Sequence, residues 1–444
     1  MNLLLINKSL KKTELNIVFL SFFLYICNKK INMGQPVRNI IKESHPELSA
    51  KPFYTLLIDG NNLLRQSLSD TKTNSEGIHY GGIFQFFLQI RMLLTAEYKY
   101  DYVYVVFDDT DSGILRYQIY NEYKANRDKN YAKHLIDGEE SEYWKRLNQT
   151  IKTMEDSIYN KKSKKKTNTK VYTEEELALI EERKRKKEIV DENFERERNI
   201  IMMYCVEMSI RVLFDNKTEG DDFIAYYVAN KKPEERIIIV STDQDLTQLI
   251  SPTVAVYNRT LKKYLNIKNF HKIKGYPVEN VLLKKILCGD PSDNIGNIKG
   301  LSENRLMELM PEISERPVTI KEVKERAQQM IDERIKEKKK PLQWHENIIH
   351  GISNKEYNGD FYEINEKIIN LKKPLLTKKA EEEIEAMMYA PMEPDDNSFS
   401  NLYRMILRDN ITDLLDEKAF ARFFLPFKEL SDREKRRYEE EMSE

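Results

Sequence analysis

Short apolar runs alternate with segments of helical periodicity along the first half of the chain. Phe53–Ile58, Tyr102–Phe107 and Ile237–Val240 each have the length and composition of a buried strand. Between the first two runs, the apolar side chains of Tyr80–Ala96 recur at helical spacing and predict a covering helix. Alternating strands and helices favour right-handed connections and a mainly parallel sheet flanked by helices. The pattern therefore predicts an α/β fold.

The ends of the three predicted strands carry acidic residues. Asp59 follows the first strand, Asp108 follows the second, and Asp243 and Asp245 follow the third. In a parallel sheet the carboxyl ends of the strands meet at one edge, where ligands bind. Carboxylates gathered there without Lys or Arg between them repel one another unless a cation lies among them. We therefore expect a divalent-metal site at this edge.

Further acidic residues extend the set. Glu219, Asp221 and Asp222 crowd the start of an amphipathic helix, where the helix dipole tolerates negative charge. Asp290 and Asp293 lie in a turn rich in Gly, Pro and Asn. Hard oxygen donors without His or Cys favour Mg²⁺ or Mn²⁺ over zinc. Two such ions about 4 Å apart can activate a water and stabilise the leaving oxygen of a phosphodiester. The residues predict a metal-dependent phosphodiesterase that acts on nucleic acid.

Composition narrows the classes of protein that fit. Of the 444 residues, 40% are hydrophobic and 33% are charged, which is typical of a folded chain rich in exposed helices. Three cysteines, far apart and without His neighbours, argue against a disulfide framework or a zinc site and indicate a reducing, intracellular compartment. The chain has neither a Gly-x-x-x-x-Gly-Lys loop nor a Gly-x-Ser-x-Gly elbow, which disfavours P-loop NTP chemistry and acyl transfer.

The first 50 residues contain one apolar segment, Asn16–Cys27. It is shorter than the roughly 20 residues that span a bilayer, so we expect no membrane partner. Three interpretations of this region stay open: translation that begins at Met33, a membrane anchor, and an unstructured extension.

Aromatic and basic side chains are mixed in Arg116–Arg127, a predicted helix. Spacings of three or four residues would place five of them on one side: Arg116, Tyr120, Tyr123, Lys124 and Arg127. Aromatic rings stack on bases while Lys and Arg meet phosphates, so this side is a predicted nucleic-acid surface. The alternative is an ordinary amphipathic helix whose basic side chains extend into solvent.

Residues 134–200 are strongly charged and interrupt the strand–helix alternation. From 161 to 187 there are eleven basic and five acidic residues, a net charge of +6 in a chain with a net charge of −1. Three interpretations are a solvated helical hairpin, a nuclear-localisation signal, and a positive funnel that gathers a single strand over the acidic site. The funnel would contact phosphates through Lys161, Lys162, Lys164, Lys165 and Lys166.

Taken together, six short motifs resemble the structure-specific 5′-nuclease superfamily, which includes flap endonucleases, 5′→3′ exonucleases and the phage ribonuclease H group. They occur in family order, and the region around Tyr257–Ile267 and the helical tail are most similar to the phage ribonuclease H branch. The motifs are LLIDGNN (56–62), VVFDD (105–109), YKANR (123–127), EGDD (219–222), VSTDQDLTQL (240–249) and GDPSDNIGNIKG (289–300).

The resemblance implies two Mg²⁺ or Mn²⁺ ions and a role for each acidic residue. One ion would be held, directly or through water, by Asp59, Asp108, Glu219, Asp221 and Asp243. A second, looser site would be completed by Asp222, Asp245, Asp290 and Asp293. Lys124 and Arg127 resemble the basic pair that meets the scissile phosphate at the foot of a helical arch. The groups implied in catalysis are Lys124, Arg127, Asp59, Asp108, Asp221 and Asp243.

The turn Gly289–Gly300 is similar to the family's helix–three-turn–helix, which binds the sugar–phosphate backbone of a duplex and often binds a monovalent cation. Its implied nucleic-acid contacts are Gly296, Lys299, Gly300 and Arg305. Here Arg305 would supply the charge that a lysine usually provides, because residues 301–305 depart from the family pattern.

The implied organisation has three parts. Residues 1–50 form an N-terminal extension, residues 51–270 form a catalytic α/β domain of PIN-like type with an arch over 128–200, and residues 271–444 form a helix–three-turn–helix and helical C-terminal domain. We expect a monomer in the cytoplasm of a host cell, encoded by a virus.

The implied activity is that of a 5′→3′ exonuclease and flap endonuclease. It would act on DNA with a 5′ flap or 5′ end and on RNA–DNA hybrids, and would remove RNA primers or displaced strands during DNA replication. A single-strand-binding protein or a sliding clamp are the expected protein partners. Two alternatives are a PIN-type single-strand ribonuclease and a catalytically inactive structure-specific DNA-binding protein.

Overall fold

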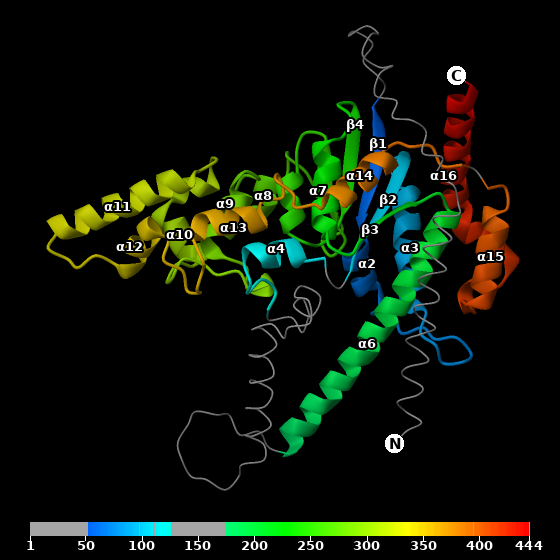
Figure 1. Cartoon of the computed structure of the whole chain (residues 1–444), viewed down its shortest axis with the longest axis horizontal. Helices are drawn as coiled ribbons and strands as arrows, with labels where there is room; N and C mark the ends of the chain where they lie inside the picture. Colours follow the sequence, from blue (N-terminus) through cyan, green and yellow to red (C-terminus); the bar gives the residue numbers. More distant parts are fainter. Residues whose placement is uncertain (1–51, 97, 110–111, 126–173, 394, 444) are drawn as a thin grey trace.

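The computed structural model describes residues 52–96, 98–109, 112–125, 174–393 and 395–443. At their centre is a six-stranded sheet in the order β3-β2-β1-β4-β5-β6 (Figure 1). Neighbouring strands pair in parallel except β5 and β6, which are antiparallel. The predicted α/β fold with a mainly parallel sheet is therefore confirmed. The strands are β1 (Phe53–Asp59), β2 (Tyr100–Asp108), β3 (Arg211–Asp215), β4 (Glu235–Val240), β5 (Val254–Asn258) and β6 (Lys263–Leu265).

Both faces of the sheet are covered by helices, because alternate side chains of a strand point to opposite faces. In β1, Leu56 and Ile58 belong to one hydrophobic core, and Leu57 belongs to the core on the other face. This burial on two sides explains why the central strands are continuous apolar runs. The first core is closed by α2 (Gly60–Ser67), α3 (Gly81–Leu94), α6 (Glu174–Glu207), α15 (Ser398–Arg408) and α16 (Glu417–Ser443). The second is closed by α7 (Gly220–Ala229), α8 (Phe270–Lys274) and α14 (Lys378–Met387).

A third hydrophobic core lies outside the sheet, in the helical part drawn on the left of Figure 1. It is built almost entirely from residues 283–369 and includes two tyrosines of the first half, Tyr120 and Tyr123. The short helix that precedes these tyrosines is α4 (Ile114–Ile119). The remaining helices of this part are α9 (Asn280–Cys288), α10 (Glu303–Leu309), α11 (Ile320–Lys336), α12 (Gln343–His350) and α13 (Phe361–Ile369).

The C-terminal helices α15 and α16 pack against the sheet domain. Leu402, Phe424 and Phe427 are buried in the same core as Leu56 of the central strand. A buried ion pair between Arg211 of β3 and Glu434 of α16 also joins these segments. Residues 271–444 are therefore divided among three cores. We propose that the second domain is limited to about 278–369 and that α14, α15 and α16 belong to the sheet domain.

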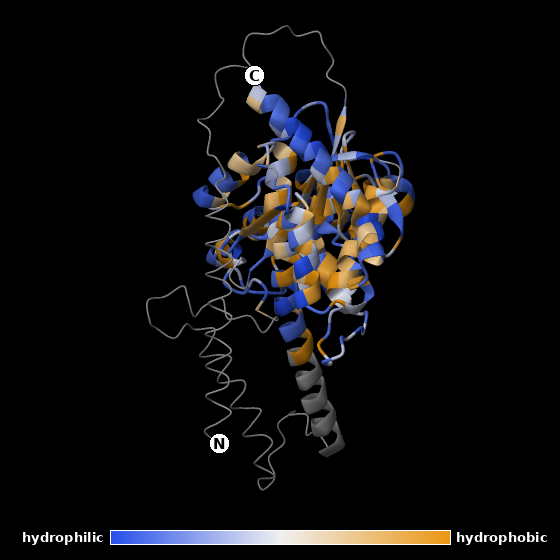
Figure 2. Ribbon diagram, turned by 90° about the vertical axis from the view of Figure 1, so that its right-hand side faces the viewer, coloured by the Kyte–Doolittle hydropathy of each residue, from blue (hydrophilic) through white to orange (hydrophobic). Residues whose placement is uncertain are grey.

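Figure 2 shows the hydrophobic residues gathered at the centre of the molecule and the outer end of α16 as mainly hydrophilic. None of the helices in the described part of the chain is long and apolar enough to cross a membrane. The described part of the predicted arch is residues 174–200, which belong to the long helix α6. The rest of that arch and Asn16–Cys27 lie outside the described residues.

Candidate metal centre

Asp59 is placed by the end of β1 and by the start of α2. As the N-cap of α2, its carboxylate accepts a hydrogen bond from the backbone N–H of Asn62 at 2.9 Å. Aspartate is favoured there because it satisfies an N–H group that has no partner within the helix. The Ser241 hydroxyl, at the end of the neighbouring strand β4, donates to the same carboxylate at 2.8 Å. The sequence therefore places Asp59 through its own local structure, whereas Ser241 reaches it only through strand pairing.

Asp108 ends β2 and is held from two directions. Its carboxylate accepts a hydrogen bond from the backbone N–H of Gly220, the first residue of α7. A Cβ atom on Gly220 would lie 2.8 Å from the Asp108 carboxylate, so any larger residue here would displace that carboxylate from its present position. The Asp108 carbonyl accepts a hydrogen bond from Arg198 of α6 at 3.0 Å. Arg198 has no recognisable signal in the sequence, where it is one of many charged residues in a long helix.

Four acidic side chains converge at this edge of the sheet. Burial raises the pKa of Asp221 well above its usual value, and Asp243, Asp59 and Asp108 raise it further. Burial also raises the pKa of Asp59 to about 7; hydrogen bonding by Asn62 opposes this shift, and the charge of Asp108 adds to it. A bound cation would reduce this repulsion between the carboxylates. The structure therefore brings Asp59, Asp108 and Asp243 of the strand ends together with Asp221 of the helix start. It places Asp245, Glu219 and Asp222, which were also predicted, among other partners.

This arrangement predicts a pH-dependent loss of stability in the metal-free protein. A carboxyl group whose pKa is raised by folding favours the folded state at low pH, and this contribution is lost as pH rises from about 4 through about 7. In a metal chelator, thermal unfolding should therefore show that Asp59→Asn raises the melting temperature more at pH 8 than at pH 5. If the melting temperature changed by the same amount between pH 5 and pH 8 in wild type and in the variant, the electrostatic interpretation would be contradicted.

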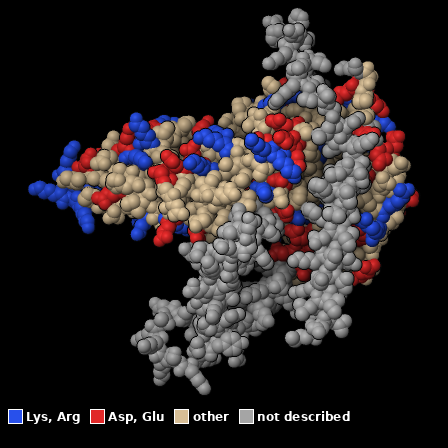
Figure 3. Space-filling view, in the orientation of Figure 1, with Lys and Arg blue, Asp and Glu red and all other residues tan. Residues whose placement is uncertain are grey.

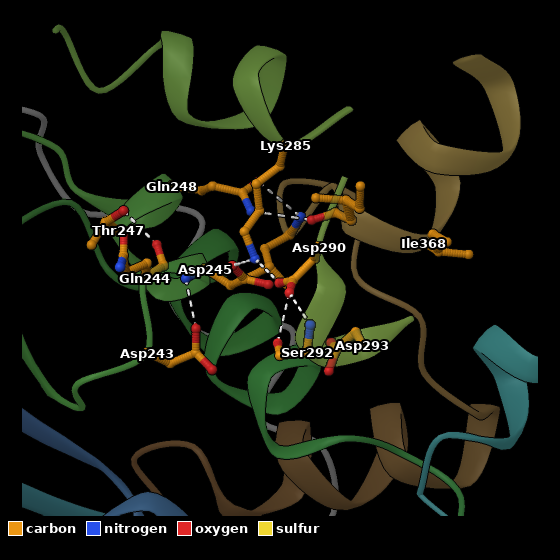
Figure 4. Close-up of polar contacts among 12 residues, drawn as sticks. Asp243, Gln244, Asp245, Thr247, Gln248, Lys285, Asp290, Ser292, Asp293 and Ile368 are labelled. Carbon is orange, nitrogen blue, oxygen red and sulfur yellow. Dashed lines mark hydrogen bonds and ion pairs between the residues drawn. The ribbon is translucent and has the colours of Figure 1, made fainter. Parts of the chain in front are cut away.

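A second acidic cluster is centred on Asp245, Asp290 and Asp293, whose carboxylate oxygens lie within 4.8 Å of one another. Asp245 begins the 3₁₀ turn after β4, and the other two residues lie in the Gly289–Gly300 turn. Lys285 of α9 reaches into the cluster and pairs with Asp290 at 2.6 Å and with Asp245 (Figure 4). The cluster thus already contains one cationic group.

Lys285 changes the electrostatics of this second cluster. Burial acts to raise the pKa of Asp290, but the Lys285 ammonium and the hydrogen bonds from Ser292 lower it to about 2. Burial raises the pKa of Asp245 to about 6, with Lys285 opposing and Asp243 adding to the shift. Sequence reasoning missed Lys285, because a lysine on an amphipathic helix is typical of an exposed face.

Asp222, a predicted metal ligand, is instead fully buried beside Arg116. Arg116 pairs with Asp222 and, at 2.9 Å, with Glu219, and it donates a hydrogen bond to the Ile368 carbonyl at 2.8 Å. The backbone N–H of Leu375 donates to Asp222 at 2.9 Å. Arg116 is only 5% exposed, so its guanidinium does not face a nucleic-acid strand in this structure. The geometry favours an anchoring role for this pair, which ties α4 to α7 and α13.

The predicted helix over Arg116–Arg127 is wrong over residues 120–125, because α4 ends at Ile119 and a turn follows. Tyr120 and Tyr123 are each 2% exposed, so neither ring is available to stack on a base in this structure. The Tyr120 ring stacks on Tyr357, with ring centroids 4.6 Å apart. The Tyr123 hydroxyl donates to Glu219 at 3.0 Å. Both rings pack internally because the turn points them toward the third core.

Lys124 lies in this turn with a backbone φ of 53°. Its backbone N–H donates to the Asp293 carbonyl at 2.8 Å, and its ammonium pairs with Glu219. Lys124 is only 8% exposed, and its two contacts join Glu219, which precedes α7, to the Asp293 turn of the second cluster. The other predicted basic contacts, Arg127, Lys161, Lys162, Lys164, Lys165 and Lys166, lie outside the described residues.

The Gly289–Gly300 turn divides its predicted phosphate contacts into two kinds. Gly296 is buried, and its N–H donates to the Tyr357 hydroxyl at 2.9 Å. Lys299, Gly300 and Arg305 are exposed, and the Arg305 guanidinium donates to the Gly300 carbonyl. A phosphate could therefore reach the last three residues, while the N–H of Gly296 has an internal partner.

Residues 54–275, half of the chain, match the family model described as 5′-3′ exonuclease, N-terminal resolvase-like domain. The chain belongs to this family. The match covers almost all of the sheet and the acidic strand ends described above, but not α14, α15 and α16, which complete the two cores. Five of the six motifs lie within the match, and the resemblance to 5′→3′ exonucleases is thereby confirmed.

Curated relatives match over shorter stretches. The 5′-3′ exonuclease of Mycoplasmopsis pulmonis is 34% identical over 93 residues, 21% of this chain and 31% of the relative. The ribonuclease H of Enterobacteria phage T4 is 34% identical over 112 residues, 25% of this chain and 35% of the relative. The DNA polymerase I of Rhizobium leguminosarum is 33% identical over 115 residues, 24% of this chain and 11% of the relative. The matched stretches thus span at most about a third of these relatives.

Among solved structures, the T5 D15 protein co-crystallised with metal ions aligns with 85% of this chain and 99% of its own, at 15% identity and a TM-score of 0.46. The flap endonuclease-1 of Methanococcus jannaschii aligns with 87% of this chain and 94% of its own, at 14% identity and a TM-score of 0.43.

Proposed function

We propose that this chain is a divalent-metal-dependent 5′-nuclease that hydrolyses phosphodiester bonds of DNA and RNA–DNA hybrids at 5′ ends and 5′ flaps. The observation that carries the proposal is the convergence of Asp59, Asp108, Asp221 and Asp243 in a domain of the 5′-3′ exonuclease family. Neighbouring carboxylates that raise the pKa of Asp59 and of Asp221 fit a cation better than they fit any neutral ligand.

The proposed first ion would be held by the four converging carboxylates, and a second by Asp245, Asp290 and Asp293. Oxygen donors of this kind suit Mg²⁺ or Mn²⁺. When bound, the ions would lower the pKa of a water and offset charge on the phosphodiester. We place Glu219 and Asp222 outside the ligand set, since Lys124 and Arg116 already neutralise them.

Lys124 is the proposed phosphate-positioning cation. Its backbone contact to Asp293 places it beside the second acidic cluster, and its ammonium, which is buried on Glu219, would exchange that carboxylate for the phosphodiester. Lys285, which pairs with Asp245 and Asp290, would either share that cluster with a second ion or move toward the substrate when the ion binds. Arg127 remains a proposed partner of Lys124, by resemblance alone.

The experiment that tests the function compares three 5′-labelled substrates: a 5′-flap duplex, a nicked duplex and an RNA–DNA hybrid. We expect cleavage of at least one in Mg²⁺, with no cleavage in a chelator. Preference for the hybrid would support primer removal, as would be expected from the likeness to a ribonuclease H. Cleavage restricted to single-stranded RNA would instead favour a PIN-type ribonuclease. Binding of flaps without cleavage in any divalent ion would favour an inactive DNA-binding protein.

A further inference from the structure

A concentrated positive charge lies far from the acidic clusters, at the turn between α11 and α12. Residues 334–340, called the hairpin tip here, contain five basic residues and one acidic residue, a net charge of +4 in a chain with a net charge of −1. The basic residues are Arg334, Lys336, Lys338, Lys339 and Lys340. Figure 3 shows this charge at the extreme end of the molecule, beyond the body of α11 and α12.

The hairpin tip is an ordered structure with its own hydrogen bonds. The N–H of Lys339 donates to the Arg334 carbonyl at 2.8 Å, and the Arg334 guanidinium donates to the Lys340 carbonyl at 2.9 Å. Lys338 adopts a left-handed φ of 56°, which reverses the chain direction. Arg334 thus closes the turn, while the four lysines are exposed.

The helix that carries the tip is also firmly held. A capping box formed by Thr319 and Glu322 begins α11, and Val323 and Ala327 bury one face of the helix in the third core. Ile331, about two turns further along than Val323, is also buried. α11 has 17 residues, so it projects the tip by about 25 Å from its first turn. The lysines are therefore presented at a fixed place.

The tip shares one structural unit with the exposed end of the Gly289–Gly300 turn. The Asn347 side chain of α12 donates to the Lys299 carbonyl at 2.8 Å, and the Lys299 N–H donates to the Ile352 carbonyl at 2.9 Å. The Arg305 guanidinium lies 5.9 Å from the centre of the Trp344 ring. α12 begins just after the tip and is about 12 Å long, so Lys299 and the tip lie at opposite ends of this short helix.

We propose that the hairpin tip is a second phosphate-binding site for the duplex arm of the substrate, separate from the Gly289–Gly300 turn. Successive base pairs rise by about 3.4 Å, so a helix about 12 Å long corresponds to roughly three to four base pairs. A duplex that contacts Lys299 can thus meet the tip about a third of a turn further along, past Arg305, which lies beside Trp344 near the start of α12. Lysine clusters without aromatic neighbours suit phosphates irrespective of sequence. This inference rests on the proposed function.

The test uses a tip variant, K336Q/K338Q/K339Q/K340Q, which keeps Arg334 to close the turn. Its matched control, K418Q/R422Q/K428Q/R436Q, removes four exposed positive charges from α16, at the opposite end of the molecule. Both should unfold at the wild-type temperature. Binding to 5′-flap DNA is measured in a chelator, with duplex arms of about 6 and about 18 base pairs chosen to end before and after the tip.

We expect the tip variant to bind the long arm at least about 10-fold more weakly than wild type, and the short arm equally well. The slope of log affinity against log salt should fall by about 0.9 for each phosphate that the tip no longer neutralises, on the long arm only. Wild-type affinity of the tip variant for the long arm would overturn the inference. So would an equal loss on both arms, or the same loss in the control, since each indicates only general electrostatics.

A cleavage assay tests the proposed nuclease function independently of the binding experiment. Cleavage of the short-arm flap in Mg²⁺ reports on the acidic clusters and should be the same in wild type and tip variant. If neither protein cleaves in any divalent ion, the proposed nuclease activity fails, while the arm-length dependence of binding still decides the role of the tip.

Discussion

Asp221→Asn is expected to lower Mg²⁺-dependent cleavage of a 5′-flap substrate by about 10³-fold or more, while the folded protein becomes more stable without metal. Asp221 is the carboxylate on which Asp243, Asp59 and Asp108 all act, so removing its charge takes the most repelled ligand from the proposed site. The same removal relieves the repulsion in the metal-free protein. Initial rates under substrate saturation, with thermal unfolding in a chelator, check both halves of the prediction.

Two controls make this result interpretable. Asp191→Asn changes an exposed carboxylate on α6 that pairs with Arg65 at 3.0 Å, and it should leave cleavage within about twofold of wild type. Flap binding by Asp221→Asn, measured in Ca²⁺, should remain detectable, because the exposed Lys299 and Arg305 are unchanged. Near wild-type cleavage by Asp221→Asn would remove this residue from the metal centre. A variant that binds no flap and unfolds early would show a structural role instead.

Phe427→Ala is expected to lower the free energy of unfolding by about 3–5 kcal/mol, because it removes a large side chain from a closely packed core. Phe427 lies on α16 and is completely buried, with its ring 6.0 Å from that of Phe87 on α3 and 5.5 Å from that of Phe424. Unfolding in denaturant, followed by circular dichroism, measures the change.

Leu425→Ala provides the matched comparison, because Leu425 lies two residues away on the same helix and is 53% exposed. Its replacement should change the free energy of unfolding by less than about 0.5 kcal/mol. Equal effects of the two substitutions would show that α16 does not pack on the sheet domain in solution. A large effect of Phe427→Ala alone supports the assignment of α15 and α16 to that domain.

The strand ends illustrate what could be predicted from local pattern. The apolar run before Asp59 and the run before Asp108 pair in parallel, with Asp59 beside Val106. Their acidic ends meet because parallel strands in register end at one edge. Asp59 acts through local structure as the N-cap of α2 and was therefore recognisable in the sequence. The contact of Gly220 with Asp108 was not, because it joins residues 112 positions apart.

The charge pairs show what local pattern could not supply. Arg116 and Asp222 are 106 residues apart and share two hydrogen bonds in a buried site. Lys285 and Asp245 meet across two different elements, α9 and the turn after β4. The spacing of residues along a helix predicts only which side chains lie within a turn or two of one another. From that spacing we predicted that Arg116 is exposed, whereas the tertiary structure buries it.

The sequence by itself determined the alternation of strands and helices, the acidic residues at their ends and the family to which the chain belongs. Each of these depends on a periodicity or motif of a few residues. Only the tertiary structure decided which carboxylates are neutralised by Arg116, Lys124 or Lys285 and which remain facing one another. It also decided that α16 packs beside α3 and that the hairpin tip shares a unit with Lys299. These contacts join segments far apart in the chain, and their energies depend on burial and distance, which no local pattern contains.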